Sequence, residues 1–261
     1  MHAPFELADI SADVLARLRD RAPRVHCVTN SVAQQYTANM LLAAGAVPSM
    51  TLAHEEIGHF VRGADALLIN LGTFDAERRA AVAAALAAAE AGQKPWVLDP
   101  VFIERSAPRA EFARELIAHR PAVVRLNHAE FASLSGGGAA ADAPQRFAQT
   151  AATVVALTGD ADVVTDGERR AEIANGDALM GLVTAMGCAG SALVAAALAV
   201  EADAWLATVA ALTAFGVAGE VAAESARGPG TFAVAIIDAL YHLDRATLRE
   251  RARISLAEVS S

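Results

Sequence analysis

The chain has 261 residues, the length of one large α/β domain. Hydrophobic residues make up 54% of it and aromatic residues only 5%, so Ala, Val and Leu must supply most of the core. The formal net charge of −9 leaves no excess of basic side chains to replace the counterions of a nucleic acid or to bind an anionic membrane, which argues against both partners.

The beginning of the sequence and its two cysteines bear on the compartment. The first residues include Glu6, Asp9 and Asp13 and lack the basic and apolar regions of a signal peptide. The uncharged run at about 204–219 is short and Ala-rich for a membrane span. Cys27 and Cys188 are too few for a disulfide framework and are expected to be reduced. We therefore expect a cytoplasmic protein.

Several enzyme classes lack their motifs in this sequence. Lys94 is the only lysine, and no G-x-x-x-x-G-K-[ST] occurs, which excludes P-loop, Schiff-base and protein-kinase lysines. Neither G-x-S-x-G nor a G-x-G-x-x-G after a strand is present. His54 and His59 are five residues apart and would face different sides of a helix, so a zinc-protease site is not expected.

Short apolar runs alternate with helical patterns along most of the chain. The runs contain little polar alternation and predict buried parallel strands at Val25–Thr29, Val47–Met50, Ala66–Asn70, Trp96–Asp99, Ala122–Leu126 and Thr153–Thr158. The patterns between them predict helices at Val32–Ala44, Glu55–Gly63, Asp75–Ala91 and Arg109–His119. This alternation predicts an α/β fold in one domain, residues 1–261, with a mostly parallel sheet covered by helices on both faces.

The pattern changes after Thr158. Asp162–Arg169 predicts a hairpin, because Asp166 and Gly167 form a typical turn pair. Apolar helices are expected at about 188–200, 203–226 and 231–243.

Polar residues gather where the predicted parallel strands end. They are Thr29, Asn30, Asn70, Asp99, Arg125, Asn127 and Thr158. Ligands of open α/β sheets bind beyond the carboxyl ends of the strands, so these side chains should share one edge. Each also has an ordinary interpretation. Asp99-Pro100 is common in turns, and Asn127 with Glu130 can form a helix capping box.

The stretch Thr184–Leu193 joins small residues to an apolar helix. Gly187, Ala189 and Gly190 let a phosphate approach the backbone, and the helix directs its first N–H groups toward it. The field of the helix end predicts a lowered pKa for the Cys188 thiol. Close packing alone also accounts for such small residues.

Taken together, these motifs resemble the hydroxyethylthiazole kinase family of the ribokinase superfamily. The resemblance runs from about Arg24 to Leu243 and rests on 25-VHCVTN-30, 36-YTAN-39, 41-LLAAGAVPSM-50, 68-LINLGT-73, 98-LDPV-101, 127-NHAE-130, 186-MGC-188 and 228-GPGTF-232. It implies a ribokinase-like three-layer sandwich. It also implies transfer of the γ-phosphoryl of ATP, with Mg²⁺, to the hydroxyl of 4-methyl-5-(2-hydroxyethyl)thiazole in thiamine salvage.

The resemblance also implies roles for individual residues. Cys188 and Gly187 would be catalytic, Asn30, Met50 and Ala185 would bind the thiazole, Arg125 and Thr158 would bind ATP, and Asp99 and Glu130 would act near Mg²⁺. The family forms homotrimers with active sites between subunits, which is implied here too.

The sequence departs from the family pattern in three places. Phe102–Ser106 replaces the glycine-rich segment that usually follows Asp-Pro. Leu126 replaces the glycine of the family's Arg-Gly-Asn, and Ala185 replaces the glycine of its Thr-Gly. Alanine at position 185 would be costly if its φ were positive. Three alternatives stay open: a hydroxymethylpyrimidine kinase, a nucleotide-dependent hydrate dehydratase, or a non-catalytic protein that binds a nucleotide or a thiazole.

Overall fold

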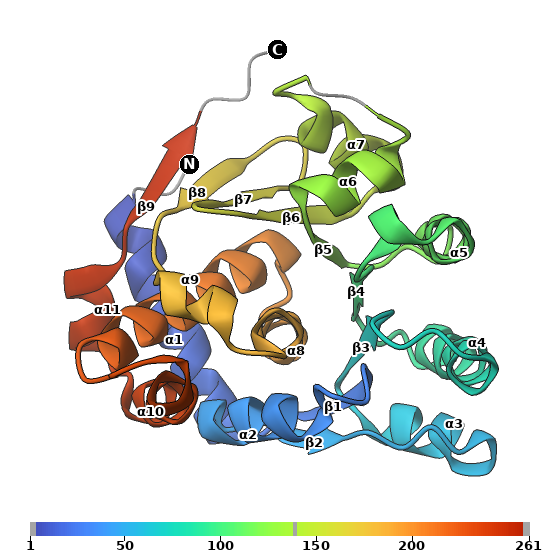
Figure 1. Ribbon diagram of the computed structural model, residues 1–261, viewed down its shortest axis with the longest axis horizontal. Helices are drawn as coiled ribbons and strands as arrows, with labels where there is room; N and C mark the ends of the chain where they lie inside the picture. Colours follow the sequence, from blue (N-terminus) through green and yellow to red (C-terminus); the bar gives the residue numbers. More distant parts are fainter. Residues whose placement is uncertain (1–3, 138–139, 258–261) are drawn as a thin grey trace.

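The computed structural model describes residues 4–137 and 140–257. One nine-stranded sheet forms its centre, in the order β2-β1-β3-β4-β5-β6-β7-β8-β9 (Figure 1). The strands are β1 (Arg24–Val28), β2 (Val47–Ser49), β3 (Ala66–Asn70), β4 (Trp96–Asp99), β5 (Val123–Asn127), β6 (Val154–Thr158), β7 (Asp162–Thr165), β8 (Arg170–Ile173) and β9 (Ile254–Ala257).

The sheet is parallel from β2 to β6, and β7, β8 and β9 extend it as antiparallel strands. The parallel strands inside the sheet are almost wholly buried, and β3 is buried at all its positions, whereas the edge strand β2 is partly exposed. Their near-continuous apolar runs follow from this burial. The mostly parallel α/β sheet predicted from the sequence is confirmed.

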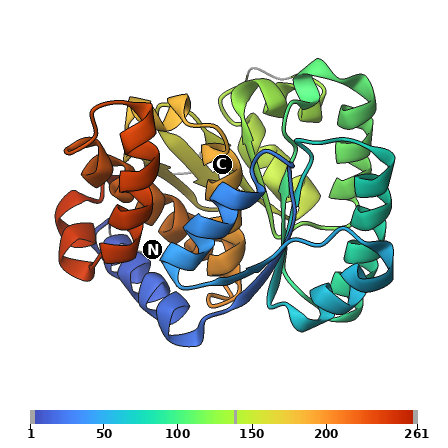
Figure 2. The same cartoon turned by 60° about the horizontal axis from the view of Figure 1, so that its bottom comes forward.

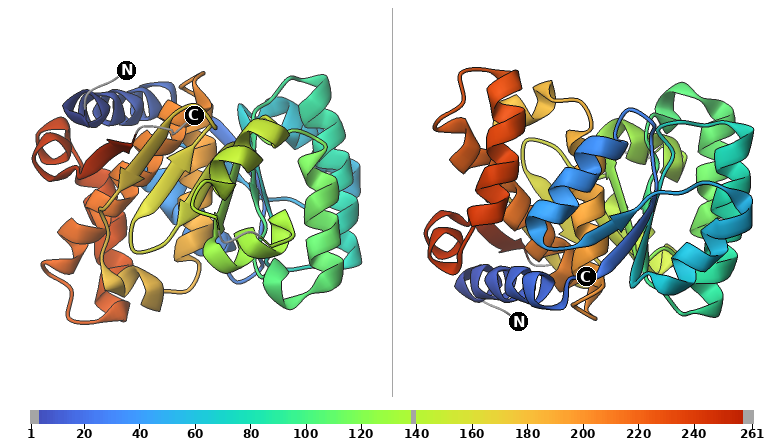
Figure 3. Two further views of the ribbon diagram at one scale, coloured as in Figure 1. Left: turned by 90° about the horizontal axis from the view of Figure 1, so that it is seen from above. Right: turned by 90° about the horizontal axis from the view of Figure 1, so that it is seen from below.

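Two helical layers cover the sheet, and each has its own hydrophobic core. One layer consists of α1 (Pro4–Arg21), α2 (Gln34–Ala44), α8 (Met186–Leu198), α9 (Ala204–Ala223), α10 (Pro229–His242) and α11 (Arg245–Arg251). The other consists of α3 (His54–Gly63), α4 (Ala76–Ala91), α5 (Ala107–Ile117), α6 (His128–Ser135) and α7 (Ala143–Ala151). Figure 2 shows the two layers on opposite sides of the sheet. In both views of Figure 3, α4 and α5 lie on one flank and α10 and α11 on the other.

The predicted strands and helices are present with small shifts of their ends. β1 begins at Arg24 and ends at Val28, one residue earlier than predicted. Asp75 caps α4 by accepting a 2.7 Å hydrogen bond from the N–H of Arg78. The sequence did not predict α1, α7, α11, β9 or the short 3₁₀ helices η1 (Ile103–Arg105) and η2 (Ala178–Leu182), and of α6 it predicted only the capped start.

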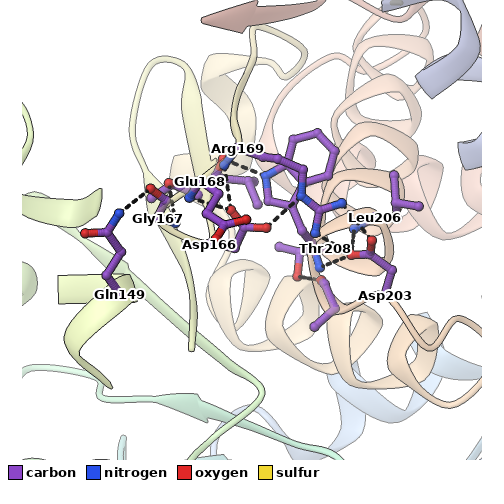
Figure 4. A network of polar contacts seen from close by, with 12 residues as sticks. Gln149, Asp166, Gly167, Glu168, Arg169, Asp203, Leu206 and Thr208 are labelled. Atoms are coloured by element: carbon purple, nitrogen blue, oxygen red, sulfur yellow. Dashed lines mark hydrogen bonds and ion pairs between the residues drawn. The ribbon is translucent and has the colours of Figure 1, made fainter. Parts of the chain in front are cut away.

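The β7–β8 hairpin is confirmed, and a network of polar contacts joins its turn to the start of α9 (Figure 4). Gly167 in the turn has φ +95, a conformation that glycine adopts without strain. Arg169 donates to both carboxylate oxygens of Asp203, at 2.7 and 2.9 Å, and to Asp166 at 2.7 Å. Asp203 in turn caps α9 by accepting from the N–H groups of Trp205 and Leu206.

One helix, α9, is long and apolar enough to cross a membrane by length and composition. In this fold 78% of its apolar window is buried inside the protein, and it packs against α1, α8 and α10. Burial within the core therefore accounts for its composition.

Candidate active site at the carboxyl edge of the sheet

The polar ends of the central strands meet at one edge, as predicted. In the register of β3 and β4, Asn70 lies opposite Asp99, and in that of β5 and β6, Asn127 lies opposite Thr158. The amide of Asn70 donates a 2.7 Å hydrogen bond to Oδ2 of Asp99. Adjacent parallel strands therefore present these groups side by side, because their carboxyl ends coincide.

The first two turns of α8 pack against this edge of the sheet. Ser191 is fully buried, and its hydroxyl donates a 2.8 Å hydrogen bond to Oδ2 of Asp99. Nη1 of Arg125 donates to the carbonyl of Gly187 at 2.9 Å and to Oγ of Ser191 at 3.3 Å. A buried network thus connects β3, β4, β5 and α8. Ser191 was not among the predicted site residues, although it follows Gly187 by four residues and so shares its helix face.

The start of α8 offers free donors. Ala185 precedes the helix and supplies no side-chain cap. Within the described chain, the N–H groups of Gly187 and Cys188 have no backbone acceptor. Unsatisfied amides at a helix N-terminus, together with the helix dipole, make a site for an anion.

A cavity of about 600 Å³ opens beside these groups. The two residues predicted to bind ATP, Arg125 and Thr158, line it together with Gly187, which was predicted to be catalytic. Cys188, Asp99 and Glu130 are not among the residues of its wall. Its wall also includes the 175–181 loop, and Leu212 and Phe215 of α9. Nε of Arg125 is buried without a hydrogen-bond partner. Asp162, which the sequence pattern predicted only as part of the hairpin, also lines the cavity.

Cys188 is buried next to this network, and the predicted lowering of its pKa is wrong. Burial raises the pKa of the thiol to about 12, and the nearby Asp99 carboxylate acts in the same direction. Hydrogen bonding to Asn70 and the charge of Arg125 oppose these effects without overcoming them. The desolvation of the thiolate therefore outweighs the helix-end field, and the group is a neutral thiol near pH 7.

Glu130 forms the capping box that the sequence allowed as its ordinary interpretation. Its Oε2 accepts from the N–H of Asn127 at 2.9 Å, and Oδ1 of Asn127 accepts from the N–H of Glu130 at 2.9 Å. Oε1 of Glu130 accepts from the N–H of Phe102 at 3.0 Å. Burial raises the pKa of Glu130, and so does the charge of Asp99. The carboxyl thus ties the β4–α5 loop to α6 close to Asp99.

Asp99 and Glu130 suit a cation that both carboxylates bind better than a metal ion coordinated entirely by protein side chains. Burial raises the pKa of Asp99, so its charged form lacks solvation. Both hydrogen bonds that its side chain accepts go to Oδ2. No group of three His, Cys, Asp or Glu side chains that could hold a metal exists among residues 4–137 and 140–257. Mg²⁺ commonly binds one or two carboxylates and completes its shell with phosphates and water, and this donor set fits that pattern.

Two departures from the family pattern lie in left-handed backbone. Ala185 has φ 73 and Phe102 has φ 60, where a side chain is strained and glycine is not. The cost foreseen for alanine at position 185 is therefore present.

Asn30 and Met50 lie apart from the cavity, beyond the ends of the neighbouring strands β1 and β2. The side chain of Asn30 accepts from the N–H of Val32 at 3.0 Å. It approaches Gly72 so closely that a Cβ there would lie 2.5 Å from its amide nitrogen. Met50 is partly buried against the core. The structure does not bring these two residues into the space that Arg125 lines.

Comparisons with known proteins show the family to which this chain is related. The model of the hydroxyethylthiazole kinase family matches residues 15–246. A probable hydroxyethylthiazole kinase of Agrobacterium fabrum is 44% identical over 97% of this chain and 98% of its own length. The hydroxyethylthiazole kinase of Granulibacter bethesdensis is 45% identical over 92% of each chain.

Two solved kinase structures resemble this chain in fold. The hydroxyethylthiazole kinase protein from Pyrococcus horikoshii superposes with a TM-score of 0.92 at 38% identity and covers 96% of this chain and 100% of its own. The pyridoxal kinase of Staphylococcus aureus in complex with AMP-PCP and pyridoxal has a TM-score of 0.63 at 16% identity, over 91% and 99% of the two chains, and shares the ribokinase-like fold. By sequence and by fold, the chain belongs to the hydroxyethylthiazole kinase family.

Proposed function

We propose that this protein transfers the γ-phosphoryl of ATP to the primary hydroxyl of 4-methyl-5-(2-hydroxyethyl)thiazole, a salvage reaction for thiamine. The observation that carries the proposal is the cavity at the carboxyl edge. There Arg125 and Gly187 line the cavity, and the N–H groups of Gly187 and Cys188, which have no backbone acceptor, begin the helix whose Ser191 contacts the buried Asp99. Phosphoryl transfer requires mainly positioning and electrostatic stabilisation, and this edge supplies both.

ATP would occupy the cavity with its phosphates toward the start of α8. Gly187 and Cys188 would donate N–H groups to the transferred phosphoryl, and Arg125 would balance its charge. Thr158 lines the same space at the end of β6. The 175–181 loop with Leu212 and Phe215 would then enclose the nucleoside.

Asp99 and Glu130 would hold Mg²⁺ on the side of the phosphates. Mg²⁺ supplies charge neutralisation of the phosphate oxygens when it is bound. Asn70 and Ser191 keep Oδ2 of Asp99 hydrogen-bonded, which fixes the orientation of this carboxylate.

The acceptor alcohol would lie against Asn30, Met50 and Ala185, with its hydroxyl beside the thiol of Cys188. Because Asn30 and Met50 lie away from the cavity, a complete site needs a second copy of the chain. We therefore propose a homotrimer with active sites between subunits. The residues would form one catalytic domain per chain in the cytoplasm, with no nucleic-acid or membrane partner.

The direct test is release of ADP, measured by a coupled assay with hydroxyethylthiazole, with hydroxymethylpyrimidine and with no acceptor. We expect release that depends on Mg²⁺ and on the thiazole alcohol. Faster release with the pyrimidine alcohol would assign the related kinase instead. Binding of ATP or of the thiazole without release of ADP would identify a non-catalytic relative.

Arg125 offers a residue-level test of the ATP site. Arg125→Ala should raise the KM for ATP about ten-fold or more, as expected for a lost charge-assisted contact of roughly 1.5–3 kcal/mol. Arg125→Lys keeps the charge without the planar fork and should give a smaller rise. Arg62→Ala, an exposed change on α3, is the control. An unchanged KM in folded Arg125→Ala would remove Arg125 from the site.

A further inference from the structure

The buried ring of His26 connects β1 to the segment that follows β2. His26 is 0% exposed. Its Nδ1 lies 2.8 Å from Oγ of Ser49, and its Nε2 lies 3.2 Å from the carbonyl oxygen of Thr51. The ring of Phe60 in α3 packs against it with centroids 6.0 Å apart. One side chain thus contacts the residues on both sides of Met50.

The partners determine the protonation state of this ring. A carbonyl oxygen only accepts, so Nε2 must carry the hydrogen, and Nδ1 must accept the hydroxyl hydrogen of Ser49. Burial lowers the pKa of His26 to about 4, so the ring is neutral at physiological pH. This single tautomer makes both hydrogen bonds at once.

The chain around Met50 has few other supports. The β1–β2 register ends with His26 opposite Ser49. Beyond it, within the described residues, no backbone-to-backbone hydrogen bond involves Met50 or Thr51. The side chain of Thr51 contacts Glu56 and accepts from the N–H of Ala53 at 3.4 Å. Among residues 4–137 and 140–257, the carbonyl of Thr51 accepts a hydrogen bond only from His26.

We infer that His26 is a positioning residue for the alcohol substrate, because it fixes the backbone on both sides of Met50 and so directs the Met50 side chain toward the thiazole. The inference rests on the proposed function, in which Met50 contacts the acceptor. His26 should therefore affect the binding of the alcohol. It should not affect the binding of ATP, because Arg125 and the ATP cavity belong to other strands.

Four variants separate this role from a general effect on folding. His26→Leu keeps an apolar side chain of similar size and loses both hydrogen bonds. His26→Gln keeps a donor for the carbonyl of Thr51. Thr153→Val is the matched control, because it removes a buried 2.7 Å hydrogen bond to the carbonyl of Pro121 at the opposite end of the sheet. Met50→Ala reports whether Met50 itself contacts the alcohol.

The measurements are KM for each substrate, kcat, and the rise in Tm caused by the thiazole alcohol. We expect His26→Leu to raise the KM for the alcohol about ten-fold, the scale of one or two lost hydrogen bonds, with the KM for ATP unchanged. His26→Gln should recover part of this loss. The alcohol should stabilise the His26→Leu protein less than the wild type, and Thr153→Val should change none of these ratios.

The outcomes distinguish the two proposals. If Met50→Ala raises the KM for the alcohol but folded His26→Leu and His26→Gln do not, the positioning role is overturned. An equal rise in both KM values for His26→Leu also overturns it. If Met50→Ala leaves the KM for the alcohol unchanged, the assignment of Met50 in the proposed function fails instead. Should His26→Leu not fold, the ratio of KM values in His26→Gln decides.

Discussion

Ala185 combines a functional position with a strained backbone. It precedes the first turn of α8 with φ 73 and ψ −2, a left-handed conformation that costs an L-residue roughly 1–2 kcal/mol. The strain lies next to the free N–H groups that we assign to the phosphoryl group. Relief of this backbone strain should therefore affect both stability and catalysis.

Ala185→Gly should stabilise the fold slightly. The relief of about 1–2 kcal/mol of strain is offset by about 0.4–1 kcal/mol of added freedom in the unfolded chain. The net gain in the free energy of unfolding is therefore between about 0 and 1.6 kcal/mol. Urea denaturation measures it. Ala152→Gly, at φ 49 after α7, is the positive control away from the site. Ala189→Gly within α8 should instead lose about 1 kcal/mol. A loss of stability in Ala185→Gly would contradict the strain.

The neutral thiol of Cys188 leads to a prediction about pH. With a pKa raised to about 12 by burial and by Asp99, the thiolate is absent below about pH 9, since the raised value keeps the proton on sulfur throughout that range. Its alkylation by iodoacetamide should stay slow from pH 6 to 9. The pH dependence of kcat should have the same shape in the wild type and in Cys188→Ala.

Cys188→Ala should also lower kcat by about 100-fold or less, because the neutral thiol only hydrogen-bonds the hydroxyl of the alcohol and the backbone N–H groups remain. Cys188→Asp should keep substantial activity, because a carboxylate can accept the proton of the alcohol. A phosphorylated thiol detected by mass spectrometry would contradict this role. Full activity with Ala and loss of the fold with Asp would identify a cysteine that only fills the core.

At the scale of elements, the parallel strands were predictable because their burial leaves continuous apolar runs, and their polar ends marked the edge that carries the site. The capping box of Asn127 and Glu130 was also readable, since it is local in sequence. The network of Asn70, Asp99 and Ser191 was not, because its members join through tertiary packing of α8 on β3 and β4. Likewise β9 exists only by pairing with β8, a contact between distant segments.

The hairpin turn and α9 offer a prediction for an interaction between elements. Arg169 forms a forked pair with Asp203 and lies 4.6 Å from the centre of the Trp205 ring. Lysine cannot reproduce the fork or stack in the same way, so Arg169→Lys should lower the free energy of unfolding by about 1–2 kcal/mol. Chemical denaturation gives the value, with Arg146→Lys on α7, an exposed pair, as control. Equal losses of unfolding free energy in Arg169→Lys and Arg146→Lys would mean that the two-pronged pair of Arg169 with Asp203 contributes no extra stability.

At the scale of the whole molecule, the acidic chain has one lysine, and exposed apolar residues lie on α2, on α10 and on the edge strand β2. Leu42 of α2, Val47 of β2, and Val234 and Tyr241 of α10 are each at least 47% exposed, and α2 packs against both β2 and α10. Apolar residues gathered on adjoining elements are typical of a surface that contacts another chain. Met50 follows β2 directly, so such a contact would lie beside the proposed thiazole site.

Mixing two inactive variants tests the site between subunits. If one subunit supplies Asn30 and its neighbour supplies Cys188, mixed trimers of Asn30→Ala and Cys188→Tyr will contain some sites with neither change. After subunit exchange, part of the wild-type rate of ADP release should then return. In each mixed trimer, some sites combine an unchanged Asn30 from one subunit with an unchanged Cys188 from its neighbour. Exchange is verified by native mass spectrometry with one variant isotope-labelled, and each variant mixed with itself is the control. Verified exchange without recovery would mean that each site is built within one chain.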